Sequence, residues 1–172
     1  DLVGMARSQP TIIRRAPCQE VILTGEDADL NVLPALKCWP LDGGRYITFP
    51  LVITRDPESG RRNVGTYRMQ IFDSQTAGIH WQTHKGGAGH YRAGEAQNSE
   101  RLEVAVALGG DPATIWSGSL PLPPDMDEMV VAGIVREQPV ELVRCTTVDL
   151  EVPATAEFVL EGYVIPGELR PE

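Results

Sequence analysis

Short apolar runs separated by glycine and proline are the feature that most restricts how this chain can fold. Its 172 residues include 17 glycines and 14 prolines, and most of these lie between runs rich in Val, Ile, Tyr and Phe. Gly and Pro mark turns, and β-branched and aromatic residues favour strands. The spacing therefore predicts a mainly β fold with many turns, in which sequential strands pair as an antiparallel meander.

The expected elements follow from these runs. Strands are predicted at 20–24, 46–54, 64–72, 77–83, 102–108, 140–146 and 157–165. Asp111-Pro112 predicts a capped helix through Ser117, and Asp125 predicts a second helix to about Arg136. Residues 86–100 are expected to form a helix or a long loop. Pro50 indicates an edge or a bulge inside its strand.

This pattern describes one domain with two or three short helices. Residues 1–18 are a weakly patterned lead-in, and residues 19–172 are the domain. A closed or split antiparallel β-barrel is the expected architecture, because it hides strand edges, and a sandwich is the alternative.

Charge and cysteine content exclude several classes of function. The net charge of −9 gives no basic face for nucleic acid and no reason to bind an anionic membrane. No apolar run reaches the length of a membrane span, and no signal peptide is evident. Cys18, Cys38 and Cys145 lack zinc or disulfide spacing, so we expect free thiols in a reducing, cytoplasmic compartment.

The segment from Arg62 to Gln70 has unusual contents for a strand. It carries an amide oxygen at Asn63, a glycine at Gly65 and a cation at Arg68. Regular alternation would put Asn63 and Arg68 on opposite faces, and a bulge at Gly65 would return them to one face. A plain surface strand with an exposed arginine is the alternative interpretation.

Other candidate residues have a structural and a chemical interpretation. Glu128 follows Asp125 by three residues, so we favour a capping box over a hard-metal ligand. His80 and His84 would lie about 13 Å apart on a strand, too far to share zinc. The turn from His84 to Gly89 places Lys85 beside glycines, which suits either an anion site or a flexible loop.

Several collinear motifs resemble the UbiD-type, prenylated-FMN-dependent decarboxylase family, from about Pro17 onward. The matching stretches are Leu33-Pro34, Cys38-Trp39-Pro40, Asn63 to Gln70, Trp81 to Gly87, Ala107 to Ala113, Asp127-Glu128, Ala132-Gly133, Asp149 to Ala154, Ala156-Glu157 and Leu160-Glu161-Gly162. The resemblance implies a split antiparallel β-barrel, flavin-reductase-like, that binds prenylated FMN.

The resemblance also implies roles for particular residues. Asn63 and Glu128 would hold Mn2+ (or Mg2+) against the flavin phosphate, and residues 117–120 would contact K+ through their main chain. Hard oxygen ligands suit such cations. The residues implied to line the flavin are Thr66, Tyr67, Arg68, His80, Trp81, Gln82, Lys85 and Gly86.

By the same resemblance, the activity is non-oxidative decarboxylation of an aromatic or α,β-unsaturated acid. Arg68 would hold the substrate carboxylate, and Glu172 would be the first acid of the catalytic network, with the second acid expected beyond it. The family implies a prenyltransferase that supplies the cofactor, and a homo-oligomer of the full-length enzyme. Further N- and C-terminal domains are expected, so the 172-residue chain by itself is expected to be inactive. A flavin-binding module without catalysis and a purely structural domain are the alternatives.

Overall fold

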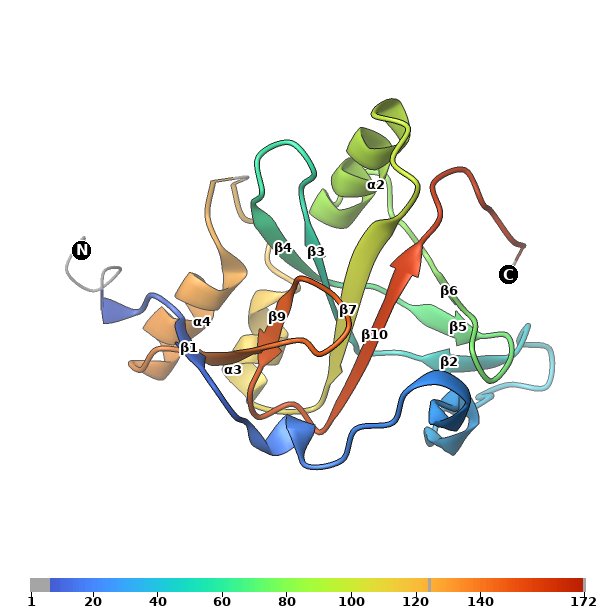
Figure 1. Ribbon diagram of the computed structural model, residues 1–172, viewed down its shortest axis with the longest axis horizontal. Coiled ribbons are helices and arrows are strands. Elements are labelled where there is room, and N and C mark those ends of the chain that lie inside the picture. The colour runs from blue at the N-terminus through green and yellow to red at the C-terminus, as the bar shows by residue number, and fades with distance from the viewer. Residues whose placement is uncertain (1–6, 124, 172) are drawn as a thin grey trace.

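Within residues 7–123 and 125–171, the fold consists mainly of three small sheets and the short helices α2, α3 and α4 (Figure 1). The computed structural model describes residues 7–123 and 125–171. The central sheet has the order β10-β7-β3-β4 and consists of β10 (Phe158–Val164), β7 (Leu102–Leu108), β3 (Leu51–Arg55) and β4 (Arg62–Thr66). Its strand pairs are all antiparallel.

Two three-stranded sheets flank the central one. The first has the order β2-β5-β6 and consists of β2 (Arg45–Ile47), β5 (Met69–Ile71) and β6 (Ala77–Ile79). The second has the order β1-β8-β9 and consists of β1 (Thr11–Ile13), β8 (Glu141–Arg144) and β9 (Glu151–Pro153). The mainly β prediction is confirmed. Within the described residues, however, the sheets do not close into a barrel.

The helices are short and lie at the ends of strands. They are α2 (Gly86–Ala96), α3 (Pro112–Ser117) and α4 (Glu128–Arg136), with 3-10 turns at Pro17–Gln19, Gly25–Asp27 and Leu30–Val32. In Figure 1, α3 and α4 lie together beside β9, while α2 lies at the other end of β7, beside the β3–β4 hairpin. The helix predicted from Asp111-Pro112 through Ser117 is confirmed as α3. The Asp111 side chain caps it by accepting a hydrogen bond from the Thr114 N–H.

Alternation along β3 and β4 divides the interior into two cores. Leu51, Ile53 and Val64 belong to the first core, which also includes residues of α4, β8 and β9. Val52 belongs to the second core, with Tyr67 and residues of β5 and β7. Successive strand residues face opposite sides of a sheet, so one strand can supply both cores.

One long hairpin passes through two sheets, which corrects the predicted strands 46–54 and 64–72. Both strands break, at residues 48–50 and at 67–68, and each continues in the other sheet. The β3–β4 register runs without interruption past Gly65, so the predicted bulge at Gly65 is wrong. Between the pairs Ile47↔Met69 and Leu51↔Thr66, residues 48–50 on one strand lie opposite residues 67–68 on the other, so three residues face two. The extra residue therefore lies on the strand that contains Pro50.

Other predicted boundaries also need correction. Residues 20–24 form no strand and instead expose Val21, Ile22 and Leu23. The expected lead-in contains β1, which pairs in parallel with β8. The strand expected at 77–83 ends at Ile79, and β9 was not predicted. In each case pairing with a distant strand, rather than local composition, decides whether a short segment becomes a strand.

The cysteines agree with the expectation of free thiols. Cys18 and Cys145 are half-buried, Cys38 is exposed, and all three are free. Burial raises the pKa of the Cys18 and Cys145 thiols, which keeps them protonated at neutral pH. A helix long and apolar enough to cross a membrane does not occur in residues 7–123 and 125–171.

Candidate functional site

The outer edge of β4 is where several predicted site residues meet. β4 is an edge strand of the central sheet, so its outward main-chain groups need other partners. The Val64 N–H donates to Glu128 Oε2 at 3.1 Å, and the Thr66 N–H donates to the Gly118 carbonyl at 2.9 Å. Lys85 Nζ donates to the Thr66 carbonyl at 2.7 Å. The starts of α4 and α2 and the end of α3 are thereby fixed to one strand.

Glu128 is a buried carboxyl group rather than a member of a capping box. Asp127 caps α4 by accepting from the Met129 N–H, so the preferred interpretation of Glu128 and the cap assigned to Asp125 are both wrong. Glu128 is the first residue of the helix and is only 8% exposed. Burial raises its pKa to about 7. A carboxylate in this position gains from a cation beside it.

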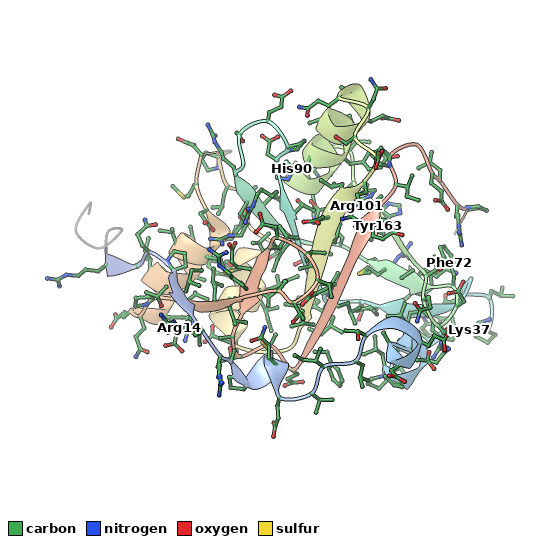
Figure 2. All side chains as sticks on the ribbon, in the orientation of Figure 1. Arg14, Lys37, Phe72, His90, Arg101 and Tyr163 are labelled. Atoms are coloured by element: carbon green, nitrogen blue, oxygen red, sulfur yellow. The ribbon has the colours of Figure 1, made fainter. Side chains whose placement is uncertain are left out.

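Asn63 faces the first turn of α2. A Cβ atom added to Gly86 would lie 1.9 Å from Asn63 Oδ1, so glycine is required for this close approach. The Asn63 Nδ2 atom is buried and has no hydrogen-bond partner. Further along the same helix, Thr54 Oγ1 and His90 Nδ1 lie 2.8 Å apart and fix α2 to β3. Figure 2 labels His90 at this junction.

Unpaired buried polar atoms are concentrated on β4. Among the described residues, the buried side-chain atoms without a hydrogen-bond partner are Arg62 Nε, Asn63 Nδ2 and Thr66 Oγ1. Such atoms are rare in folded proteins, and each requires an explanation such as an ion, a water or a ligand. Their concentration within five residues of one strand indicates a site that a bound group completes.

Arg62 belongs to the site although its sequence context does not predict this. Its guanidinium lies 2.5 Å from Asp127 Oδ2 and 3.6 Å from Glu151 Oε2, so it joins β4 to the cap of α4 and to β9. These ion pairs hold the start of α4, and therefore Glu128, against β4. No local signal distinguishes this arginine from an exposed strand arginine, because its partners lie far away in the sequence.

Tyr67 is buried where the chain leaves the central sheet. It is 3% exposed, and its ring meets the Trp81 ring edge-on with centroids 5.1 Å apart. Its hydroxyl oxygen accepts from the Gly87 N–H at 2.9 Å. A Cβ on Gly65 would lie 2.4 Å from the Tyr67 ring, which explains the glycine without a bulge. Contact between the Tyr67 side chain and a flavin stays a prediction.

Gly65→Ala is expected to destabilise the protein by about 1–3 kcal/mol, because the added methyl group overpacks against the Tyr67 ring. Gly162→Ala in β10 is the matched control, since a Cβ there meets nothing within 4 Å. Urea unfolding of both variants measures the difference. Equal stability of the two variants would show that the Tyr67 ring moves aside freely.

The remaining predicted flavin residues lie around the break that follows Tyr67. Arg68 is exposed, its guanidinium lies 4.9 Å from the centre of the Tyr46 ring, and its carbonyl accepts from the His80 N–H. His80, Gln82 and Gly86 are exposed, while Trp81 and Lys85 are half-buried. The fold thus brings these residues to one region beside β4. Glu172 lies outside the described residues.

Metal binding at this edge would require a mixed set of ligands. Within the described part of the chain, no group of three or more His, Cys, Asp or Glu side chains is placed to hold a metal ion. An amide oxygen, one carboxylate and oxygens from a bound phosphate form the kind of set that Mn2+ or Mg2+ accepts.

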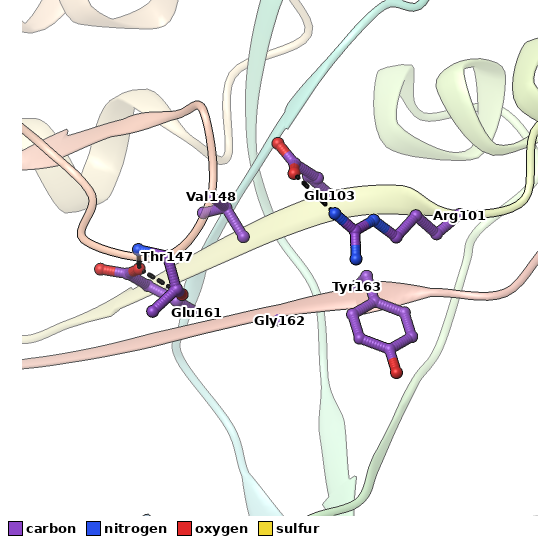
Figure 3. Close-up of a pocket in the computed structure, with 7 residues that line it drawn as sticks. All are labelled: Arg101, Glu103, Thr147, Val148, Glu161, Gly162 and Tyr163. Carbon is purple, nitrogen blue, oxygen red and sulfur yellow. Dashed lines mark hydrogen bonds and ion pairs between the residues drawn. The ribbon is translucent and has the colours of Figure 1, made fainter. Parts of the chain in front are cut away.

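A hollow of about 200 Å³ elsewhere on the surface has a structural explanation (Figure 3). It lies between β7, β10 and the loop at 147–148. Glu161 accepts hydrogen bonds from the main chain of Thr146 and Thr147, and Glu103 accepts from that of Asp149. Its acidic side chains therefore hold this loop in place. None of the predicted site residues lines it.

Comparison with protein families gives a match over almost the whole chain. Residues 11–172 match the family described as UbiD, the 3-octaprenyl-4-hydroxybenzoate carboxy-lyase Rift-related domain. An uncharacterized protein of Aquifex aeolicus is 54% identical over 159 residues, covering 92% of this chain and 32% of that protein. One of Archaeoglobus fulgidus is 51% identical over 174 residues, covering 99% and 35%. The chain spans about a third of the length of these relatives.

Solved structures of UbiD-class enzymes have the same fold. HmfF from Pelotomaculum thermopropionicum, in complex with FMN, matches with a TM-score of 0.88 and 35% identity, covering 96% of this chain and 38% of that one. An evolved dimeric form of HmfF, in complex with prenylated FMN (prFMN), gives 0.87 and 34%, covering 96% and 39%. Vanillic acid decarboxylase from Sedimentibacter hydroxybenzoicus gives 0.88 and 33%, covering 94% and 35%.

Proposed function

This chain belongs to the UbiD family of carboxy-lyases, and from that membership we propose that it is the domain that binds prenylated FMN in a longer decarboxylase. FMN and prenylated FMN in the HmfF structures support the flavin. The split-barrel arrangement of the domain belongs to the same proposal.

The observation that carries the proposal is the cluster of unsatisfied groups along β4. Three buried polar atoms lack partners there, and the buried carboxyl group of Glu128 lies against the same strand. A divalent cation held by Asn63 Oδ1 and Glu128 would offset the negative charge of the buried carboxylate. A flavin phosphate, as a further ligand of that cation, would also offer acceptor oxygens to unpaired donors such as Arg62 Nε. The residues present therefore fit the implied group.

The other residues of the site have matching roles in the proposal. Lys85 and the glycine-rich start of α2 offer a cation and main-chain N–H groups to the phosphate. Residues 117–120 offer main-chain carbonyls to K+. The bound flavin supplies the electron sink for decarboxylation. Exposed Arg68 binds and orients the substrate carboxylate as a planar fork.

The substrate and the partners are part of the proposal as well. Neighbouring structures include decarboxylases of vanillic acid and of 3,4-dihydroxybenzoic acid. These names favour a small aromatic acid, and an α,β-unsaturated acid fits the same carboxylate contact. Cofactor supply by a prenyltransferase and homo-oligomer formation by the full-length enzyme complete the proposal.

Asn63→Ala is expected to weaken binding of FMN in the presence of Mn2+ by at least tenfold, because one ligand of the bridging cation is lost. Titration of flavin fluorescence with and without Mn2+ measures this. Asn31→Ala, at an exposed asparagine in the 3-10 turn Leu30–Val32, is the matched control. Failure of the unaltered protein to bind FMN, or binding that ignores Mn2+, would overturn the proposed site.

A flavin-binding module without catalysis is the second candidate function. Its support is the length of the relatives, since the chain spans about a third of them. Measurement of carbon dioxide release separates the two. A full-length protein should decarboxylate a small aromatic acid and lose that activity in Arg68→Ala, whereas the 172-residue chain should bind flavin without turnover.

A further inference from the structure

Tyr67 is tied to the proposed cation site by more contacts than a core residue needs. Its ring lies so close to β4 and α2 that a Cβ on Gly65 would be 2.4 Å from it, and one on Gly87 would be 2.7 Å from its hydroxyl. Lys85 Nζ lies 5.1 Å from the centre of the ring. Two glycines and a lysine thus fix where this side chain lies.

The hydroxyl group, unlike the ring, adds a specific link between α2 and Asn63. Its oxygen accepts from the Gly87 N–H at 2.9 Å. Burial raises the pKa of Tyr67, while the approach of Gly87 and of the Asn63 carboxamide offsets part of that rise. A Cβ on Gly86 would lie 1.9 Å from Asn63 Oδ1, and one on the next residue, Gly87, would lie 2.7 Å from the Tyr67 hydroxyl, so both groups lie against the first turn of α2. Asn63 Nδ2 has no hydrogen-bond partner in the described structure.

The two ends of the Asn63 carboxamide face different neighbours. Nδ2 is a donor and Oδ1 an acceptor, so their orientation determines whether Asn63 can bind a cation. Oδ1 lies against Gly86, at the start of α2. A tyrosine hydroxyl has a second lone pair, and that lone pair can accept from Nδ2. A hydrogen bond from Asn63 Nδ2 to the Tyr67 hydroxyl oxygen would keep Asn63 Oδ1 turned toward the cation.

We propose that Tyr67 is the positioning residue of the cation site: when the divalent cation binds, the Tyr67 hydroxyl accepts from Asn63 Nδ2, which has no partner without the cation, so that Oδ1 faces the cation. This inference rests on the proposed function, because it assigns a purpose to Asn63 Oδ1. It adds a residue that acts through Asn63 and touches neither the metal nor the substrate. Second-sphere hydrogen bonds of this kind orient metal ligands in many proteins.

Tyr67→Phe is the direct test, because it removes the hydroxyl and keeps the ring that packs on Trp81 and Gly65. Mn2+ affinity is measured in the presence of FMN from the electron paramagnetic resonance signal of free Mn2+. We expect affinity to fall by about 10- to 100-fold. Tyr46→Phe is the matched control, because its hydroxyl bonds Gln70 Oε1 at 3.3 Å, away from β4. Unfolding curves establish that both variants fold.

A double-mutant cycle with Asn63→Ala separates positioning from a general structural effect. If Tyr67 acts through Asn63, adding Tyr67→Phe to Asn63→Ala leaves Mn2+ affinity unchanged. Additive losses would overturn the inference, and so would unchanged affinity in Tyr67→Phe alone. Either result leaves the proposed function standing, provided that Asn63→Ala weakens binding. If the unaltered protein fails to bind Mn2+ with FMN, the proposed cation site and the inference are both wrong.

Discussion

Glu128→Gln is expected to make the metal-free protein more stable at pH 8 and to abolish its binding of Mn2+. The pKa of this carboxyl group is raised from 4.5 to about 7 by burial. Protonation of the Glu128 carboxyl group therefore stabilises the folded state relative to the unfolded state. That contribution is complete below about pH 4.5 and is lost as the pH rises through about 7. A glutamine stays neutral, and its Oε1 can still accept from the Val64 N–H.

The size of the effect follows from the shift in pKa. One pKa unit corresponds to about 1.36 kcal/mol, so ionised Glu128 costs on the order of 3 kcal/mol in the metal-free protein. In urea unfolding without metal, the free energy of unfolding of Glu128→Gln should exceed that of the unaltered protein by that amount at pH 8. The difference should be much smaller at pH 5. Glu58→Gln, at an exposed residue, is the matched control. Equal stability of Glu128→Gln and the unaltered protein at pH 8 would contradict the expectation.

Mn2+ should reverse the order of stability. A cation that binds the folded state stabilises it in proportion to the logarithm of its concentration over Kd. The unaltered protein should therefore gain stability with Mn2+ and FMN, while Glu128→Gln should not. This trade between stability and binding is common where a site contains an unpaired buried charge. A gain of equal size in both proteins would show that the cation binds elsewhere.

Gly86→Ala is expected to abolish binding of Mn2+ with FMN while leaving the fold intact. The added methyl group would lie 1.9 Å from Asn63 Oδ1, so the carboxamide must rotate away. Gly86 is exposed and opens α2, where alanine is a better helix former by about 1 kcal/mol. The substitution therefore displaces Asn63 Oδ1, the proposed ligand atom, without destabilising the helix.

Gly89→Ala is the matched control for this experiment. It lies in the same helix, and a Cβ there meets nothing within 4 Å. We expect this variant to be more stable by about 0.5–1 kcal/mol with unchanged binding of Mn2+ and FMN. Titration of both variants by electron paramagnetic resonance and fluorescence provides the comparison. Full binding by Gly86→Ala would show that Asn63 Oδ1 is not a ligand.

Local signals in the sequence predicted several elements correctly. Alternation placed β7 at its observed bounds, and Asp111-Pro112 placed the start of α3. Of the two alternatives that Pro50 indicated, the bulge agrees with the extra residue at 48–50, because proline removes a ladder hydrogen bond there. The edge alternative is wrong, because β3 lies between β7 and β4. These features depend on neighbouring residues, so a single sequence contains the information that decides them.

The sequence allowed the residues of the candidate site to be proposed, but not their contacts. The motif from Asn63 to Gln70 supplied the amide, the glycine and the arginine. Glu128 was assigned to a cap, because Asp125 stands three residues before it. The actual cap is Asp127, and the Glu128 carboxyl group bonds β4 instead. Which of two nearby acids caps a helix depends on where the chain enters it, and packing of α4 against β4 determines that here.

The sequence by itself determined that the chain is mainly β, that its turns lie at glycine and proline, and which residue types surround Asn63. The tertiary structure decided that the strand through Gly65 breaks at residues 67–68 and crosses into another sheet. It also decided that Gly65 makes room for Tyr67 and that Glu128 is buried. The physical reason is that turn and strand propensities act between neighbours, whereas sheet membership and burial depend on residues far apart in the sequence.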